Sequence, residues 1–279
     1  MQQRDSLGYT LGVAAVLCVV CSLAVSTAAV SLRGRQEANV KLDQQKNILD
    51  ATGLAIGEYG VQANELTTKE IATLETYVSA KLVNLQTGEY VGDAAAADKY
   101  SLTEEAANPQ TSIQIEKNTK FNPGEPRRPK VMKVYFVKKP GTDKILQVVL
   151  PVYGKGLWGT LYGYLALKSD LETIQGLTFY QHKETPGLGG EVDNPRWKAM
   201  WDGRKLYDPS GQPKAMVFKG PAPKTNEYAV DGLSGATITS RGVTNLIRYW
   251  ASDDGYGKYL GKLKEEINED KSSTSEGDK

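Results

Sequence analysis

The segment from Asp231 to Ser240 combines hydroxyl groups with very small side chains, in the order Asp-Gly-Leu-Ser-Gly-Ala-Thr-Ile-Thr-Ser. A helix is predicted to follow, because four apolar residues recur at the spacing of one helical face: Val243, Leu246, Ile247 and Trp250. The first N–H groups of a helix lack partners inside it and lie at the positive end of its dipole, which favours an anion. Gly235 and Ala236 would let a large group approach the backbone. The composition indicates a phosphate-binding helix start or, without a ligand, an ordinary helix capped by Ser or Thr.

A second segment, from His182 to Glu191, reads His-Lys-Glu-Thr-Pro-Gly-Leu-Gly-Gly-Glu. Its proline and glycines are typical of a surface turn. His182 is the only histidine of the chain, so no second imidazole is available for a metal site. A single histidine in such a segment is typical of a loop or packing position.

The residues Gly154 to Gly159 match the G-x-G-x-x-G pattern of dinucleotide-binding loops. That pattern requires a helix directly after the glycines. The following residues, Thr160 to Leu167, instead have the composition of a strand. We therefore expect a tight turn between two strands and no NAD binding by this chain.

The elements that must position these segments are mainly strands. Segments rich in β-branched and aromatic residues, separated by Gly, Pro or Asp, predict strands at Val131–Val137, Ile145–Tyr153, Trp158–Leu167 and Thr173–Gln181, with a further short strand at Ala215–Phe218. A hairpin is predicted around Gln86-Thr87-Gly88. Thr67 and Glu70 form a capping box, and Ile71, Leu74 and Val78 mark the helical face that follows it. Ala94–Pro129 is predicted to be loop with short helical pieces, and Ile267–Lys279 a solvated polar tail.

The N-terminal region has no charged residue from Ser6 to Leu32, which is long enough for a helix that crosses a bilayer. Ser26-Thr27-Ala28 resembles a signal-peptide cleavage site, but signal-peptide apolar cores have only about 7–15 residues. We expect a retained anchor, continued by a polar helix from Glu37 to Asn47. Arg33, Arg35 and Lys41 after the span outnumber Arg4 before it, which by the positive-inside rule favours a cytoplasmic domain. A short N-terminal tail that carries Arg4 is equally compatible with export of the large domain.

The composition excludes some classes of function. With 34 Lys+Arg against 33 Asp+Glu and no basic block, nothing indicates nucleic-acid binding. The only cysteines, Cys18 and Cys21, lie in the predicted span, so the rest of the chain has no disulfide and no thiolate-ligated metal. In the membrane this pair is expected to pack against neighbouring helices, with a ligand shared with another subunit as the alternative.

The run Ser234-Gly235-Ala236-Thr237 resembles the flavinylation motif of the FMN-binding domain family of bacterial redox membrane complexes. In that family the threonine of the motif carries FMN through a phosphoester bond to its hydroxyl, which implies Thr237 here. The segment from His182 to Gly189 resembles a second hallmark of the family, in which the backbone and Thr185 would line the flavin and Leu188 would face its ring. The resemblance implies these cofactor-binding residues: Thr237, Ser234, Gly235, Ala236, Thr239, Asp231, His182, Glu184, Thr185, Pro186, Gly187, Leu188 and Gly189. It implies no catalytic residue and no metal ligand.

Further segments extend the resemblance along the chain, namely Arg4-Asp5-Ser6, the end of the span at Val25–Val30, Gly154–Leu167 and Gly176–Tyr180. Up to about Trp250 the chain is similar to the family of C subunits of the sodium-translocating NADH:quinone reductases. This resemblance implies a translocase component without independent catalysis, which relays electrons from NADH toward ubiquinone, coupled to sodium export. It also implies a six-subunit complex in the bacterial inner membrane. A flavin transferase acting outside the cytoplasm would attach the FMN, so the large domain would be periplasmic, against the charge count.

The expected fold is α+β, with one transmembrane helix followed by a mixed, largely antiparallel sheet with flanking helices. The expected division is an anchor at 1–35, a membrane-proximal α/β region at 36–130, an FMN-binding domain at 131–262 and a polar tail at 263–279. Two alternatives stay open from the sequence. One is the G subunits of the related ion-translocating ferredoxin:NAD complexes, and the other is an anchored binding module with no redox role.

Overall fold

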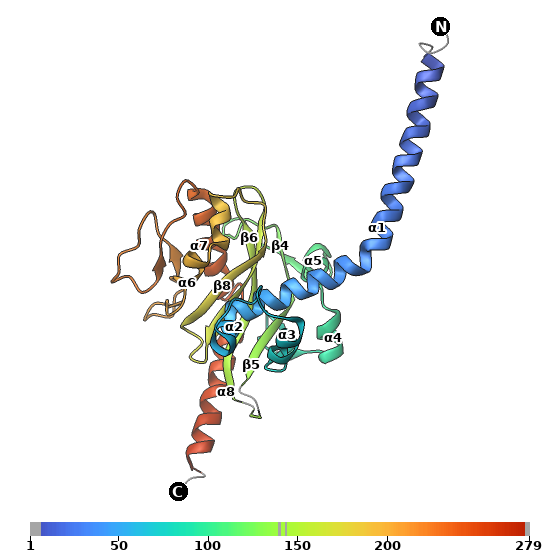
Figure 1. Ribbon diagram of the computed structural model, residues 1–279. Helices are drawn as coiled ribbons and strands as arrows, with labels where there is room; N and C mark the ends of the chain where they lie inside the picture. The colour runs from blue at the N-terminus through green and yellow to red at the C-terminus, as the bar shows by residue number, and fades with distance from the viewer. Residues whose placement is uncertain (1–6, 139–140, 143, 277–279) are drawn as a thin grey trace. The chain divides into compact units, whose positions relative to one another are not determined.

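The computed structural model describes residues 7–138, 141–142 and 144–276, so the predictions for Arg4, Asp5, Ser6 and the last three residues lie outside the described residues. The chain forms two compact units, one up to Gln44 and one from Gln45 onward. Helix α1, Leu7–Thr52, contributes to both units (Figure 1). The predicted polar helix after the span is therefore confirmed as a continuation of the anchor helix.

The first unit consists of α1 as far as Gln44, and its apolar part comes first. An 18-residue window of this helix has a mean hydropathy of 2.5, and none of that window is buried within the protein. Apolar side chains such as Leu11, Leu17 and Leu23 are more than 60 % exposed. A helix that is apolar and exposed to this extent is compatible with a single-pass membrane anchor.

The second unit is built on a six-stranded sheet with the strand order β2-β1-β5-β6-β7-β8. All neighbouring strands in it are antiparallel. The strands are β1 (Val78–Asn84), β2 (Tyr90–Val91), β5 (Val131–Lys138), β6 (Ile145–Lys155), β7 (Thr160–Lys168) and β8 (Ile174–Gln181). The four predicted central strands and the hairpin around Gly88 are confirmed.

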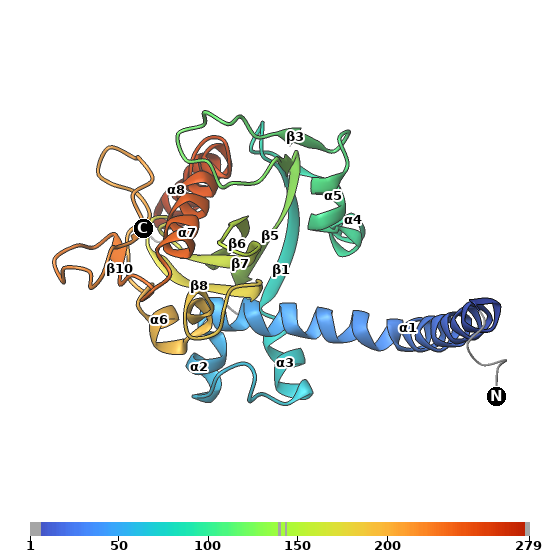
Figure 2. The same cartoon turned by 90° about the horizontal axis from the view of Figure 1, so that it is seen from above.

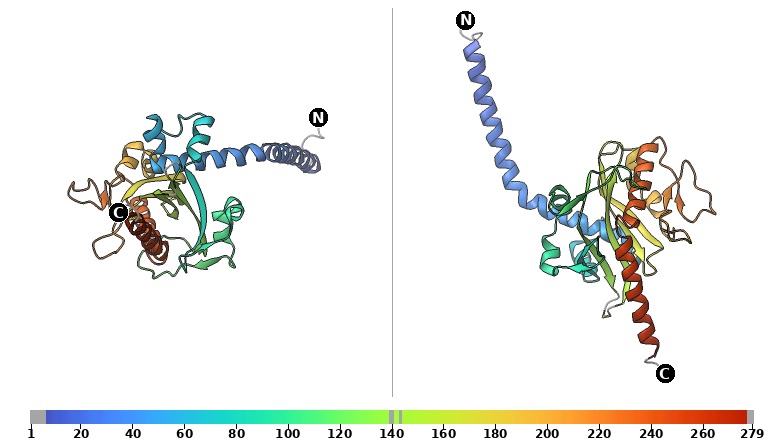
Figure 3. Two further views of the ribbon diagram at one scale, coloured as in Figure 1. Left: turned by 90° about the horizontal axis from the view of Figure 1, so that it is seen from below. Right: turned by 180° about the vertical axis from the view of Figure 1, so that it is seen from behind.

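Helices cover both faces of this sheet (Figures 2 and 3). On one face, α7 (Thr237–Ala251) and α8 (Gly257–Glu276) bury the larger core, which includes Leu150, Leu165, Leu246 and Trp250. On the other face, Ile48 and Ala51 from the end of α1 pack on Val149, Tyr164 and Ala166. The helices α2 (Leu54–Tyr59) and α3 (Thr68–Glu75) follow α1 on that side. The predicted α+β fold is confirmed.

Shorter elements complete the unit. They are α4 (Ala94–Lys99), α5 (Leu102–Ala107), β3 (Ser112–Gln114), β4 (Arg127–Pro129), the 3-10 helix η1 (Gly189–Asp193), α6 (Pro195–Ala199), β9 (Met216–Val217) and β10 (Ala229–Val230). The region from 94 to 129 thus contains the predicted short helices and also an antiparallel β3–β4 pair that the sequence did not indicate. Residues 36–130 and 131–262, which our sequence-based division separates, contribute strands to one sheet.

Two local predictions need correction. The capping box of Thr67 and Glu70 is present, but α3 ends at Glu75 and Val78 begins strand β1. The segment from Ile267, predicted as a solvated tail, is helical as far as Glu276. The physical reason is that Tyr259, Leu260 and Leu263 bury one face of α8, and Ile267 continues that face against the same core.

Candidate functional site

Thr237 is the first residue of α7, and its side chain is exposed. The N-cap position is Ala236, with φ −126° and ψ 51°, so the predicted hydroxyl cap is wrong. Ser240, the fourth residue of the helix, accepts the N–H of Leu233 with its Oγ at 3.2 Å, which ties the loop before the helix to α7 without capping it. Gly235 has φ 70°, in the left-handed region that favours glycine. The helix start therefore presents Thr237 outward, directly after a turn that carries almost no side chain.

The helix behind Thr237 is held tightly against the sheet, beside β6 (Figure 1). Its predicted apolar face is confirmed, since Val243, Leu246, Ile247 and Trp250 are all buried. Trp250 Nε1 also donates to the Tyr153 carbonyl at 2.7 Å. This packing gives the N-terminus of α7 a fixed place above the turn between β6 and β7.

Glu184 joins three segments that are distant in the sequence. It is only 5 % exposed, and its Oε1 accepts the N–H of Trp158, in the β6–β7 turn, at 2.9 Å. Its Oε2 accepts the hydroxyl of Thr239, which is fully buried in the first turn of α7. Both residues were predicted to contact the cofactor, but the structure directs their side chains inward and toward each other.

The surroundings of Glu184 keep it ionised. Burial raises the pKa of this carboxyl, but hydrogen bonds from the Thr239 hydroxyl and from the N–H groups of Trp158, Leu157 and Gly159 outweigh the burial and lower it. A carboxylate that accepts several N–H and O–H donors is stabilised in its charged form. The site thus contains a buried negative charge balanced by neutral donors.

His182 fixes the backbone just before Glu184. Its Nδ1 accepts the N–H of Glu184 at 3.1 Å, and its Nε2 lies 2.7 Å from Asp193 Oδ2. The hydrogen bond to Asp193 raises the pKa of His182, burial opposes this, and the charges of Asp193 and Glu184 add to the increase. His182 therefore acts on the shape of the segment and, with both nitrogens engaged by protein groups, is not directed at a ligand.

The segment from Thr185 to Gly189 forms a tight turn next to the start of α7. The Thr185 carbonyl accepts the N–H groups of Leu188 at 3.1 Å and of Gly190 at 2.9 Å. Gly187 has φ 76°, which favours glycine. A Cβ on Gly235 would lie 2.9 Å from Leu188 Cδ2, so the turn touches the Ser234–Ala236 stretch. The structure thus brings the two sequence-predicted segments together.

Several large apolar side chains near Thr237 are exposed. Their exposed fractions are 44 % for Leu157, 65 % for Trp158, 45 % for Leu188 and 52 % for Ile238. We call these residues the apolar rim. Of these residues, only Leu188 was predicted to face the flavin. The signal for Leu157 and Trp158 is a Leu-Trp pair between two glycines of a strand-to-strand turn, and no comparable signal marks Ile238. Large apolar groups exposed together mark binding sites more often than isolated ones do.

Asp231 serves the neighbouring loop. Its Oδ1 accepts the N–H of Ala222 at 2.7 Å, and its carbonyl accepts Trp197 Nε1 at 2.9 Å. This predicted site residue therefore orders the loop that leads to Ser234.

Among the described residues, no group of His, Cys, Asp and Glu could hold a metal ion. A cavity of 760 Å³ beside residues 207–213 and 251–254 includes none of the predicted site residues.

Comparisons with known proteins bear on this site. Residues 156–252 match the family described as FMN-binding domain, which includes the β6–β7 turn, the Glu184 segment and α7. The chain is 40 % identical to the C subunit of the Na(+)-translocating NADH-quinone reductase from Yersinia pestis, over 95 % of this chain and 96 % of the relative. It is 42 % identical to the corresponding protein from Pseudomonas aeruginosa, over 95 % and 98 %.

Solved structures give the same result. The crystal structure of Shewanella oneidensis NqrC has a TM-score of 0.72 and 31 % identity, and the match covers 81 % of this chain and 99 % of that one. The crystal structure of the corresponding protein from Parabacteroides distasonis has a TM-score of 0.60 and 29 % identity, with 82 % and 96 % covered.

Proposed function

Because this chain belongs to the family of C subunits of the Na+-translocating NADH-quinone reductases, we propose that it carries FMN on the hydroxyl of Thr237 and relays electrons within such a complex. The observation that carries this proposal is that Thr237 is exposed at the first residue of α7, directly after a turn of small residues. Thr239 is a poor competitor for the attachment, because its hydroxyl is fully buried and donates to Glu184.

The residues present fit a flavin mononucleotide. A phosphoester on Thr237 would keep a negative charge near the first N–H groups of α7, which favour anions. The apolar rim offers surface for the flat ring system, with Leu188 on one segment and Trp158 on another. The small residues Gly235 and Ala236 leave room for the linking chain. Of the residues implied by resemblance, Thr237, Ser234, Gly235, Ala236 and the Thr185–Gly189 turn would contact the cofactor, and His182, Glu184, Thr239 and Asp231 would support them.

FMN supplies one- and two-electron transfer when it is bound, so the protein needs no acid or base of its own. The chain would position the cofactor and set its electrostatic surroundings, while NADH and quinone react elsewhere in the complex. The described part of α1 has no ionisable residue between Leu7 and Leu32 apart from Tyr9 and the two cysteines, so sodium would cross through other subunits. The full-length similarity to C subunits favours this proposal over the G subunits of the ferredoxin:NAD complexes and over a module without redox function.

The partners follow from the same proposal. We expect the other subunits of a six-subunit complex, the inner membrane, and a flavin transferase that acts outside the cytoplasm. The large unit would then be periplasmic, although Arg33, Arg35 and Lys41 favour the opposite orientation by the positive-inside rule.

A reporter active only in the periplasm, fused after Ile267, tests the orientation and should be active. An inactive one, with an active cytoplasmic reporter at the same site, would reverse the orientation and make attachment by an exported transferase untenable.

The attachment is tested by replacing Thr237 with Val in the full chain, produced together with a flavin transferase. We expect complete loss of the flavin fluorescence that survives denaturation in a gel, because valine has no oxygen to esterify. Thr68→Val is the matched control and should keep the fluorescence, since Thr68 is also an exposed threonine at the first residue of a helix, α3. Mass spectrometry of the wild-type protein should find FMN on the peptide that contains Thr237. Fluorescence that persists in Thr237→Val, with the flavin mapped to Thr239 or another residue, would show that the assignment is wrong.

A further inference from the structure

The carboxylate of Glu184 connects the segments around Thr237 by hydrogen bonds. Through Oε1 it contacts the β6–β7 turn at Trp158 N, and through Oε2 it contacts α7 at Thr239 Oγ1. Its own backbone is held by His182 Nδ1 at 3.1 Å. Thr239 lies two residues after Thr237 on α7, and Trp158 is the most exposed member of the apolar rim. The carboxylate thus sets the spacing between the attachment residue and the aromatic edge of the rim.

Two glycines reserve the space for this carboxylate. A Cβ on Gly156 would lie 2.6 Å from Glu184 Oε1. A Cβ on Gly189 would lie 2.5 Å from Oε2 and 2.7 Å from the Thr239 hydroxyl. Real Cβ atoms do not approach other atoms so closely, so both positions need glycine because Glu184 is there. The glycines of two segments that look like simple turns are therefore explained by one buried side chain.

We propose that Glu184 is a positioning residue for the flavin, which fixes the N-terminus of α7 relative to the β6–β7 turn and places a negative charge close to the attachment residue Thr237. The inference rests on the proposed attachment of FMN to Thr237. A negative charge close to the cofactor opposes the arrival of electrons, since like charges repel more strongly away from water. Glu184 should therefore hold the flavin in one orientation and keep its midpoint potential lower than it would be without the charge.

The experiment compares Glu184→Gln with wild-type full-length protein, both loaded with FMN and purified in detergent. Glutamine keeps the size of the side chain but removes the charge. Its single carbonyl oxygen cannot replace both carboxylate oxygens, one of which accepts Trp158 N–H and the other the Thr239 hydroxyl. We expect a midpoint potential shifted to more positive values and at least a twofold loss of the visible circular dichroism of the flavin. A variant that folds but takes up no FMN, while the control below does, would also support the proposal, because Thr237 would no longer be presented correctly.

Two further variants separate positioning from general stability. Thr239→Val removes the hydroxyl but keeps the charge, so it should weaken the circular dichroism and shift the potential less than Glu184→Gln does. It also keeps the test available if Glu184→Gln fails to fold. Asp170→Asn is the matched control, since Asp170 is another carboxylate that accepts a threonine hydroxyl, at the far end of β7. That strand has 9 residues, so the two carboxylates are separated by about 25–30 Å, and the control should change neither signal.

The outcomes are distinct for the two proposals. Wild-type protein without FMN on Thr237 would contradict the proposed function. Wild-type protein with FMN, and Glu184→Gln and Thr239→Val variants with unchanged dichroism and potential, would overturn only the positioning role of Glu184. A lower melting temperature in both Glu184→Gln and Asp170→Asn, with the dichroism and the potential unchanged, would also overturn the positioning role. Glu184 would then be a purely structural residue.

Discussion

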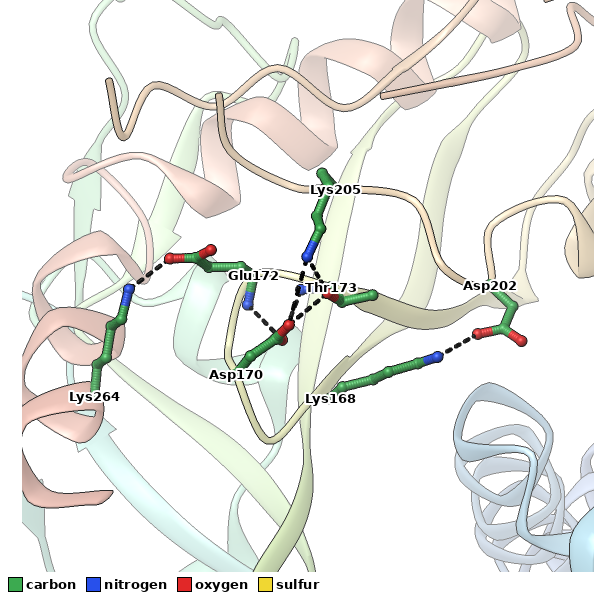
Figure 4. A network of polar contacts seen from close by, with 7 residues as sticks. All are labelled: Lys168, Asp170, Glu172, Thr173, Asp202, Lys205 and Lys264. Carbon is green, nitrogen blue, oxygen red and sulfur yellow. Dashed lines mark hydrogen bonds and ion pairs between the residues drawn. The ribbon is translucent and has the colours of Figure 1, made fainter. Parts of the chain in front are cut away.

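Two carboxylates at opposite ends of β7 accept a threonine hydroxyl and backbone N–H groups, yet they do different work. Glu184 lies at the end where the β6–β7 turn meets α7, and Asp170 lies in the turn between β7 and β8 (Figure 4). Glu184 is 5 % exposed, whereas the Asp170 side chain is 46 % exposed. The same pair of chemical groups is thus found once in the interior and once at the surface.

The Asp170 cluster is local. Oδ1 accepts the N–H groups of Glu172 at 3.0 Å and Thr173 at 2.8 Å, and Oδ2 accepts the Thr173 hydroxyl at 2.5 Å. Lys205 Nζ lies 3.6 Å from Asp170 Oδ2 and donates to Thr173 Oγ1 at 2.7 Å. The ion pairs Lys168–Asp202 and Lys264–Glu172 surround it (Figure 4). Except for Lys205, the donors to Asp170 lie within three residues, so this carboxylate stabilises a turn.

The Glu184 cluster is long-range. Trp158 and Thr239 are 26 and 55 residues away in the sequence, and its donors are neutral groups. Solvent and Lys205 stabilise the charge of the exposed Asp170 carboxylate. The charge of the buried Glu184 carboxylate is stabilised by hydrogen bonds from neutral protein groups. The difference indicates that a change near Glu184 disturbs three segments at once, and a change near Asp170 disturbs one turn. An unmatched buried carboxylate costs more free energy than an exposed one.

The largest effect is expected for Gly189→Ala. The new Cβ would meet Glu184 Oε2 at 2.5 Å and Thr239 Oγ1 at 2.7 Å, and moving the carboxylate would break its hydrogen bonds to Trp158 N and Thr239. We expect a loss of about 1–3 kcal/mol in the free energy of unfolding, as for overpacked interiors. Gly261→Ala in α8 is the control, since nothing lies within 4 Å of its Cβ, and it should be neutral or slightly stabilising. Thermal unfolding of the full chain in detergent measures both. Equal stability of the two variants would break the comparison.

The sequence predicted the strands well, because β-branched and aromatic runs between glycine turns have few other uses. The spacing of apolar residues also predicted the buried face of α7. The resemblance to the FMN-binding domain family predicted that the Glu184 and Thr237 segments lie close together. The sequence could not predict that Glu184 and Thr239 turn inward, because side-chain direction in a glycine-rich turn depends on tertiary contacts. The same holds for Ala236 at the N-cap, a position for which the sequence indicated Ser or Thr. The helical end of α8 was missed because few apolar residues, such as Leu263 and Ile267, hold it.

A smaller effect is expected for Asp170→Asn, and its dependence on pH sharpens the contrast. Burial raises the pKa of Asp170, but the Thr173 hydroxyl, the N–H groups of Thr173 and Glu172, and Lys205 together lower it below its ordinary value. A carboxyl whose pKa is lower in the folded state stabilises the protein above its unfolded pKa of about 3.9, and this stabilisation is lost as the pH falls through the folded value. At pH 7 the variant should lose about 0.5–1.5 kcal/mol, the contribution of an ordinary hydrogen bond. The difference from wild type should shrink below about pH 4.

Urea unfolding at pH 7 and at decreasing pH checks this, with Asp202→Asn as the control. Asp202 pairs only with Lys168 in the part of the chain that the structure describes, at 3.0 Å, and both side chains are more than 40 % exposed. Exposed pairs of this kind contribute about 0–1 kcal/mol, so the control should lie below Asp170→Asn and respond more to added salt. If Asp170→Asn proved as destabilising as Gly189→Ala, burial would not be what separates the two carboxylates. The contacts of Glu184 with three segments would then add no more to the free energy of unfolding than the contacts of Asp170 within one turn.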